Sequence, residues 1–341
     1  MKLFEEFQVR DLTLKNRIVM PPMCMYQATQ DGFPTLFHIC HYGTRALGGV
    51  GLVIVESTGV TPEGRITDRD LGIWNDSQAD GLKRIADTCH EYGAKVALQI
   101  NHAGRKSTSQ SGPSLAPSAL RFSDDYRVPE EMTKDQISAV AQAFGKAARR
   151  ANEAGFDALE IHAAHGYLLH EFLSPLTNRR TDAYGGNLQN RGRFLVEVLQ
   201  QVHAVWPQEK PLWLRVSASD YDSRGIDGPM MVQIINGIRH EVDLVHVSSG
   251  GLMPDKVKDY PGYQVALAEQ IRKECGLPTI AVGLISSEEM AEEILQNGRC
   301  DLVALGRELL RNPYWPVNTA VKHGVAGYVP ESYERAFTIK K

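Results

Sequence analysis

The stretch NEAGFDALEIHAAHGY at 152–167 decides the fold. A helical pattern ends in this stretch at Gly155, and a short apolar run, DALEIH at 157–162, follows the glycine. Glycine accepts the left-handed conformation that ends many helices, and a nearly continuous apolar run of this length is typical of a parallel strand covered on both faces. The stretch therefore predicts one helix–strand unit, with polar residues at the strand's carboxyl end.

The same unit recurs along the chain. Seven further runs share its length and apolar character: RIVM at 17–20, GLVIVE at 51–56, KVALQI at 95–100, LWLRVS at 212–217, DLVHVS at 243–248, PTIAVG at 278–283 and DLVALG at 301–306. Amphipathic helical patterns lie at Ser77–Tyr92, Lys134–Ala154, Asn190–Val205, Met230–Glu241, Gln264–Glu274 and Ser287–Gln296. Eight such units predict an α/β fold, a (β/α)8 TIM barrel formed by residues 1–341 as one domain. The alternative is a doubly wound open sheet, but no GxGxxG follows the first strand.

Bulk composition narrows the function classes. The chain has 341 residues and a net charge of -4, which gives no electrostatic footprint for nucleic acid or an anionic membrane. Its five cysteines include no CxxC pair, which disfavours a disulfide framework or a zinc ribbon. The N-terminus lacks a signal-peptide pattern and no apolar run is long enough for a membrane helix. We expect a cytoplasmic protein that acts on small molecules.

A polar cluster follows the fourth strand. His162, His165 and Tyr167 begin where that strand ends, at the barrel face that carries active sites. A metal site is one interpretation, but HExxH is absent and only Glu171 is a nearby carboxylate. Hydrogen-bonded pocket residues without a catalytic role are a second. The third is an oxyanion clamp, in which two imidazoles donate to a developing enolate and the phenol supplies a proton.

Two glycine-containing loops follow the last two strands. AVGLISS at 281–287 and ALGRELLRNP at 304–313 occupy the positions where barrels frequently bind phosphate. Gly283 and Gly306 would let the backbone approach an anion, and Arg307 adds a fork of donors. We therefore predict a phosphate site, against the alternative of turn glycines beside a surface arginine.

Other polar residues sit at the same end of the barrel. RIVMPPMCMY at 17–26 closes the first strand and places Cys24 and Tyr26 just beyond it. A lone cysteine is usually a small buried apolar residue, but at the active face a functional role for Cys24 is an equal alternative. Gln99 and Arg215 lie near the ends of strands three and five. A buried arginine needs an anionic partner, which a reduced flavin or a barrel carboxylate such as Glu160 would supply.

These blocks together resemble the Old Yellow Enzyme family of FMN-dependent oxidoreductases, and its bacterial NADPH dehydrogenase and xenobiotic reductase branch in particular. LKNRIVMPPMCMY, GRITDRDLGIWND, QINHAGRK, HAAHGYL with FLSP and NRRTDAYGG, and the C-terminal SYERAF carry the resemblance, which covers essentially the whole chain. It implies non-covalent, tightly bound FMN, NADPH or NADH as hydride donor, and reduction of activated alkenes by ping-pong transfer through flavin N5.

The resemblance also implies roles for single residues. The positions that would contact the flavin ring are Pro21, Pro22, Met23, Cys24, Ser57, Gln99 and Arg215. The positions that would hold its phosphate are Gly283, Gly306 and Arg307. The substrate positions are His162 and His165 for the carbonyl oxygen, Tyr167 as proton donor, Tyr26, and Arg335. The last belongs to a tail, about 328–341, that would reach a neighbouring subunit of a dimer or tetramer. Cys24 would tune the flavin potential. Ser57 stands where this branch often has alanine, and the YERAFTIKK ending also departs from it.

Two other functions remain at this point. A barrel aldolase would use the same phosphate loops with a Schiff-base lysine, but Lys95 begins the third strand, at the wrong end, and no other lysine lies inside a strand at the required depth. A redox sensor would use Cys24 as its switch. The physiological alkene and the preference between NADPH and NADH are not encoded in any motif of the chain.

Overall fold

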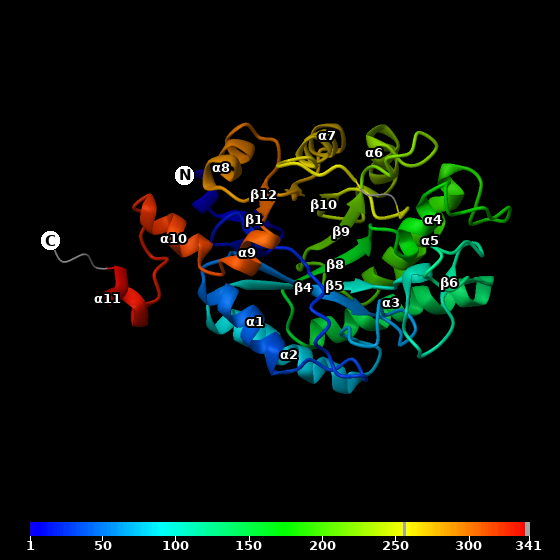
Figure 1. Ribbon diagram of the computed structural model, residues 1–341, viewed down its shortest axis with the longest axis horizontal. Coiled ribbons are helices and arrows are strands. Elements are labelled where there is room, and N and C mark those ends of the chain that lie inside the picture. The colour runs from blue at the N-terminus through cyan, green and yellow to red at the C-terminus, as the bar shows by residue number, and fades with distance from the viewer. Residues whose placement is uncertain (255–256, 338–341) are drawn as a thin grey trace.

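Eight parallel strands close into a barrel in the computed structural model, which describes residues 1–254 and 257–337 (Figure 1). The strands, in order around the barrel, are β3 (Ile18–Met20), β4 (Leu52–Gly59), β5 (Lys95–Asn101), β8 (Ala158–Ala163), β9 (Leu212–Ser217), β10 (Leu244–Ser248), β11 (Thr279–Ala281) and β12 (Leu302–Ala304). β12 pairs with β3, with Val303 opposite Ile18, and this pairing closes the ring. The TIM barrel prediction is confirmed, and the open sheet is excluded.

Eight helices surround the barrel, one after each strand in the chain (Figure 1). They are α1 (Leu36–Leu47), α2 (Asp76–Glu91), α3 (Lys134–Glu153), α5 (Leu188–His203), α6 (Gly228–Ile238), α7 (Val265–Cys275), α8 (Glu288–Gln296) and α10 (Trp315–Lys322). The six predicted helices are present within three residues of their expected ends. α6 starts before the predicted Met230 because the Asp227 side chain caps it by accepting a hydrogen bond from the Met230 N–H. α1 and α10 were not predicted.

Side chains alternate along each barrel strand between the helices and the barrel interior. On β4, Val53 and Val55 pack in the large core under the helices, whereas Leu52 and Ile54 belong to a separate interior cluster. A short hairpin, β1 (Phe7–Val9) with β2 (Leu12–Leu14), adds Val9, Leu12 and Leu14 to this interior cluster. Because Leu52 begins its strand, the hairpin fills the amino-terminal end of the barrel. The other end is left for polar side chains.

Several short elements cover the carboxyl-terminal end of the barrel. The long segment after β5 contains the turn η2 (Gly104–Lys106) and a two-stranded pair, β6 (Leu115–Ala116) with β7 (Glu130–Glu131). α4 (Leu168–Leu173) follows β8, and α9 (Arg307–Arg311) follows β12. Such βα connections build the active sites of this fold, so the functional residues are expected among them.

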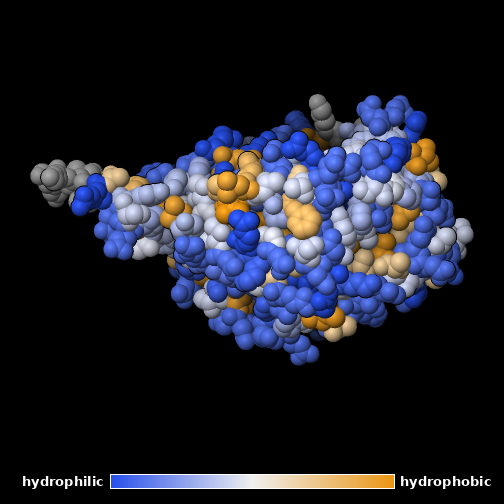
Figure 2. Space-filling model, turned by 90° about the horizontal axis from the view of Figure 1, so that it is seen from below, coloured by the Kyte–Doolittle hydropathy of each residue, from blue (hydrophilic) through white to orange (hydrophobic). Residues whose placement is uncertain are grey.

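The C-terminal tail leaves the barrel beside α10. It carries η3 (Glu331–Tyr333) and α11 (Glu334–Phe337), which project away from the barrel in Figure 1 and from one end of the mostly hydrophilic face in Figure 2. Residues 338–341 of the predicted tail lie outside the described residues. Among the described helices, none has the length and apolar character needed to cross a membrane.

Candidate active site

His162 and His165 lie side by side at the end of β8. Because β8 alternates, Glu160 and His162 point into the barrel while Leu159 and Ile161 pack outward. His165 Nδ1 lies 3.3 Å from His162 Nε2, and the two rings meet edge to face with 5.1 Å between centroids. On its far side, His165 Nε2 lies 2.7 Å from Ser248 Oγ on β10. The two imidazoles therefore contact each other directly.

The backbone around His165 is strained. His165 has φ of 58° and Gly166 has φ of 72°, both in the left-handed region. A Cβ at Gly166 would come within 2.4 Å of the Gly251 carbonyl oxygen, so the loops after β8 and β10 touch through their backbones. Tyr26 and Leu284 also have positive φ values, at the same end of the barrel. Such outliers cluster at functional sites because the surrounding structure must hold them.

Tyr167 lies beside the histidine pair. Its ring meets the His162 ring edge to face, with 4.9 Å between centroids. Burial raises the pKa of Tyr167 well above its ordinary value, so the phenol keeps its proton. Burial lowers the pKa of His162 and of His165 well below the ordinary value, and the positive charge of Arg215 adds to this effect. At neutral pH the site therefore holds two neutral imidazoles and one protonated phenol.

Lys106 is a site residue that sequence reasoning missed. It stands in η2, beyond β5, and its ammonium donates to the carbonyl oxygens of His165 at 3.0 Å and Gly251 at 3.2 Å. Its Nζ atom also lies 5.2 Å from the centre of the Tyr167 ring. Burial lowers its pKa to about 8. The prediction concerned lysines inside strands, and Lys106 does not contradict it, because it reaches the site from a loop after β5.

The segment Pro21–Tyr26 follows β3, and a buried carboxylate of β4 binds its backbone. The Met25 N–H donates to the Glu56 carboxylate of β4. The other Glu56 oxygen lies 2.8 Å from His38 Nε2, and both side chains are almost fully buried. Burial, followed by the negative charges of Asp70 and Glu56, raises the pKa of the Cys24 thiol well above its ordinary value. Cys24 is therefore a thiol at neutral pH.

Gln99 and Arg215 point into the barrel, as their places on the strands predicted. The Gln99 amide donates to Glu160 Oε1 at 2.7 Å, and the other Glu160 oxygen contacts Trp213 Nε1 at 2.7 Å and His246 Nδ1 at 2.8 Å. These contacts occupy Glu160. Arg215 forms no ion pair with it among the described residues, so the alternative of a salt bridge between the two was wrong.

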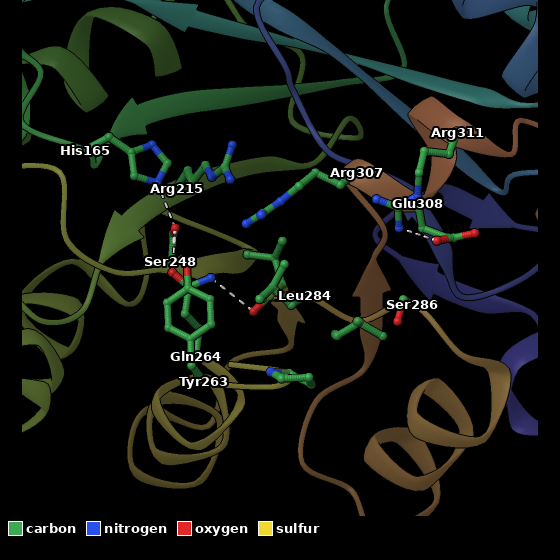
Figure 3. Close-up of a pocket in the computed structure, with 15 residues that line it drawn as sticks. His165, Arg215, Ser248, Tyr263, Gln264, Leu284, Ser286, Arg307, Glu308 and Arg311 are labelled. Atoms are coloured by element: carbon green, nitrogen blue, oxygen red, sulfur yellow. Dashed lines mark hydrogen bonds and ion pairs between the residues drawn. The ribbon is translucent and has the colours of Figure 1, made fainter. Parts of the chain in front are cut away.

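Arg215 instead faces a cavity that His165, Ser248 and Arg307 also line (Figure 3). Its guanidinium makes only a 3.5 Å contact to the Pro22 carbonyl oxygen, and its buried Nε atom has no partner. Burial lowers the pKa of Arg215, and the negative charge of Glu160 partly offsets this effect. A cation that is buried without a bound partner is costly, so the cavity is suited to an anionic or carbonyl-rich ligand.

The cavity has a volume of about 440 Å³ and runs from His165 and Arg215 toward the loops after β11 and β12. Gly283, Gly306 and Arg307, the residues predicted to bind a phosphate, line the far end of the cavity. Gly283 has φ of 132°, which favours glycine. The Arg307 side chain is exposed and lies 3.3 Å from Asp259. Sequence reasoning missed Tyr263 and Gln264, which line the cavity from the start of α7 and carry no motif.

The remaining predicted residues are placed as follows. Ser57 is buried, and its hydroxyl accepts a hydrogen bond from Asn101 Nδ2 at 2.9 Å. Tyr26 is 44% exposed at the barrel mouth. Arg335 lies on α11, which projects away from the barrel (Figure 1), and it is not among the residues that line the cavity. The His162, Tyr167, Cys24 and Gln99 side chains are not among those that line the cavity itself.

FMN fits the residues present. Its isoalloxazine ring is rich in carbonyls and gains negative charge on reduction, which suits the unpaired Arg215. Its phosphate suits a loop pair in which two glycines leave room for the backbone and Arg307 supplies a cation. Arg215, Gly283, Gly306 and Arg307 all line one cavity, and His165 of the histidine pair lines it together with Arg215.

The chain matches the family model described as NADH:flavin oxidoreductase / NADH oxidase family over residues 2–326. It is 54% identical to an NADPH dehydrogenase of Clostridium acetobutylicum, over 99% of this chain and 100% of that one. It is 48% identical to an NADPH dehydrogenase of Bacillus subtilis, over 98% and 99% of the two chains.

Solved structures give the same assignment. Morphinone reductase in complex with tetrahydroNAD is 30% identical, with a TM-score of 0.80 over 96% of this chain and 92% of that chain. A 2-naphthoyl-CoA reductase is 26% identical with a TM-score of 0.89, and the chain spans about half of its length, at 52%. The barrel, the cavity and these relatives agree with one another, and the chain belongs to the NADH:flavin oxidoreductase / NADH oxidase family, as an FMN- and NAD(P)H-dependent oxidoreductase of the Old Yellow Enzyme type.

Proposed function

We propose that this enzyme is an ene-reductase, which reduces the C=C bond of α,β-unsaturated carbonyl compounds, nitroalkenes and similar electrophiles. The observation that carries the proposal is the contact of two neutral imidazoles with a protonated phenol, in a cluster that reaches the cavity through His165. An activated alkene accepts hydride only if its oxygen can carry negative charge, and the reaction is complete only when carbon receives a proton. The site offers both functions within one cluster.

His162 and His165 would bind the activating oxygen. Neutral imidazole N–H groups stabilise an enolate by hydrogen bonding without first giving up a proton, which suits an oxyanion site. Tyr167 would protonate the carbon next to the activating group, because its phenol is protonated and contacts His162. Lys106 adds a positive charge beside the Tyr167 ring, which would stabilise the phenolate left after the proton has moved.

Bound FMN would supply the hydride-transfer chemistry between NAD(P)H and the alkene. The residues that would hold it are Gln99 and Arg215 at the ring, with Pro21, Pro22, Met23, Cys24 and Ser57 beside them, and Gly283, Gly306 and Arg307 at the phosphate. The curated relatives are named for NADPH, which supports this nucleotide as the donor.

The assembly and the place of action belong to the same proposal. A homo-oligomer, dimer or tetramer, would bring Arg335 of one chain to the substrate pocket of another, because α11 projects away from its own barrel. We also propose that the enzyme works in the cytoplasm and removes reactive electrophiles there.

The two rival functions lose their support at the site. Lys106 is the lysine that an aldolase would need, yet its ammonium is bonded to two backbone carbonyls and the chain belongs to a flavin oxidoreductase family. The raised pKa of Cys24 disfavours the thiolate that a redox sensor would use.

The proposal is tested with the purified FMN-loaded protein in two half-reactions under anaerobic conditions. NADPH should bleach the flavin absorbance, and a cyclic enone should restore it with stoichiometric loss of the C=C bond. A panel of enals, maleimides and nitroalkenes then ranks the electrophiles. Bleaching without reoxidation by any member of the panel would overturn the proposal and leave only NADPH dehydrogenation.

A further inference from the structure

Ser248 occupies a place in the site that the proposed function does not use. Its hydroxyl lies 2.7 Å from His165 Nε2, and it donates to the Oε1 atom of Gln264 at 3.0 Å. The Gln264 amide group in turn donates through Nε2 to the Val282 carbonyl oxygen at 3.1 Å. The Gln264 oxygen therefore can only face the serine hydroxyls.

The hydrogen-bond partners fix the tautomers of both histidines. His162 Nδ1 accepts a hydrogen bond from the Ala164 N–H at 3.2 Å, so its Nε2 atom carries the hydrogen. That Nε2–H lies 3.3 Å from His165 Nδ1. Two N–H groups cannot face each other at this distance, so His165 Nδ1 is bare and its Nε2 atom carries the hydrogen.

A single directed chain of donors results. It runs from the Ala164 N–H through His162, His165, Ser248 and Gln264 to the Val282 carbonyl, and a backbone group fixes its direction at each end. In this state only His162 has a donor aimed at the gap between the imidazoles. The free site is therefore not the two-donor clamp that an enolate oxygen needs.

We propose that Ser248 is the positioning residue that switches His165 between its two neutral tautomers, an inference that rests on the proposed function. When a ligand oxygen enters, His162 Nε2–H and His165 Nδ1–H both donate to it. His165 Nε2 is then bare, and the Ser248 hydroxyl turns from Gln264 to donate to it. One proton leaves Nε2 for water and one arrives at Nδ1 from water, so the ring stays neutral throughout.

Gln264 keeps a partner after the switch. Ser249 Oγ also donates to Gln264 Oε1, at 2.8 Å, so the amide oxygen does not become unpaired when Ser248 turns away. Ser249 reaches Tyr221 on its other side, at 2.9 Å, and makes no contact with His165. The two adjacent serines therefore share one acceptor, but only Ser248 touches the imidazole, which makes Ser249→Ala a matched control.

The test uses the FMN-loaded enzyme with its histidines labelled with ¹⁵N, and a para-substituted phenol as the probe, because a phenolate resembles the enolate in charge and shape. Long-range ¹⁵N–¹H spectra distinguish the two neutral tautomers. We expect the Nε2–H form of His165 in the free enzyme and the Nδ1–H form in the complex. Ser248→Ala should bind the phenol about three- to tenfold more weakly than Ser249→Ala, as expected for one lost hydrogen bond, and Ser248→Thr should restore binding.

Each failure has its own signature. If the phenol gives a long-wavelength absorbance band but His165 keeps one tautomer, or becomes doubly protonated, the switch is overturned while the oxyanion site stands. If Ser248→Ala binds the phenol as tightly as Ser249→Ala while retaining FMN, the role of Ser248 is overturned. If wild-type protein binds no phenol at all, the proposed function itself is contradicted, and the switch with it.

Discussion

The Gln99 side chain donates to Glu160 Oε1 at 2.7 Å, and this contact fixes which end of the amide faces the cavity side. Burial alone would raise the pKa of Glu160, but His246, Arg215 and Trp213 together lower it, so the carboxylate stays charged. Because the amide nitrogen is committed to Glu160, Gln99 presents its carbonyl oxygen to a ligand. Arg215 beside it presents only donors. The pair is thus matched to a ring edge that alternates N–H and carbonyl groups.

Glu160→Gln removes the negative charge and one of the two acceptor oxygens at this position, so the side chain can no longer accept from Gln99 on one oxygen and from Trp213 and His246 on the other. We expect the variant to bind FMN on the order of tenfold more weakly, because the amide of Gln99 loses its fixed direction and Arg215 loses a nearby negative charge. Titration of the FMN-free protein with FMN, followed by flavin fluorescence, measures the effect. Thermal unfolding of the FMN-free variant serves as the control. An unchanged affinity in a folded variant would show that Gln99 does not contact the ring.

Tyr167→Phe should separate the two half-reactions. The substitution keeps the ring against His162 but removes the proton donor, so alkene reduction should slow by about 10²- to 10⁴-fold while flavin reduction by NADPH stays near normal. Stopped-flow absorbance measures each half-reaction separately. Tyr126→Phe removes a phenol from the same end of the barrel and is the control. Equal losses in both half-reactions would count against a selective proton donor.

Cys24 should resist alkylation at neutral pH. Burial and the charges of Asp70 and Glu56 raise its pKa, so the reactive thiolate forms only as the pH rises well above the ordinary range for cysteine. Iodoacetamide labelling of the FMN-free protein, read by peptide mass spectrometry across pH, tests this. Cys40 is exposed and provides an internal reference within the same molecule. Labelling of Cys24 at pH 7 as fast as that of Cys40 would restore the redox-sensor function as a candidate.

Arg335→Ala should weaken enone binding without loss of FMN. The arginine lies on α11, which projects away from the barrel, and it does not line the cavity of its own chain, so we expect an effect on substrate only through a second chain. The enone Michaelis constant, the bound FMN and the mass in solution by light scattering are measured together. Glu331→Ala, in the same tail, is the control. A monomer at working concentration, or an oligomer whose enone kinetics do not change in Arg335→Ala, would remove the shared site.

The sequence was sufficient for the barrel because its strands are buried on both faces and each is punctuated by turn residues. The prediction placed Gln99 and Arg215 near the ends of their strands, and in the structure they face inward with Glu160 and His162, since alternate residues of a barrel strand face inward. Contacts between distant segments were not accessible in this way. Ser248 and Gln264 carry no motif, and Lys106 reaches His165 only through the path of its loop. The predicted bounds of α6 were shifted toward the C-terminus because the sequence reasoning did not identify Asp227 as the N-cap.

The central claim, that the site passes reducing power from NADPH to an activated alkene, has one direct test. The FMN-loaded enzyme is reduced anaerobically with one equivalent of NADPH and then mixed with cyclohexenone while the flavin absorbance is recorded. The account predicts bleaching, full return of the yellow colour, and one equivalent of cyclohexanone. A flavin that bleaches and stays reduced in the presence of cyclohexenone, maleimide and a nitroalkene alike would contradict it.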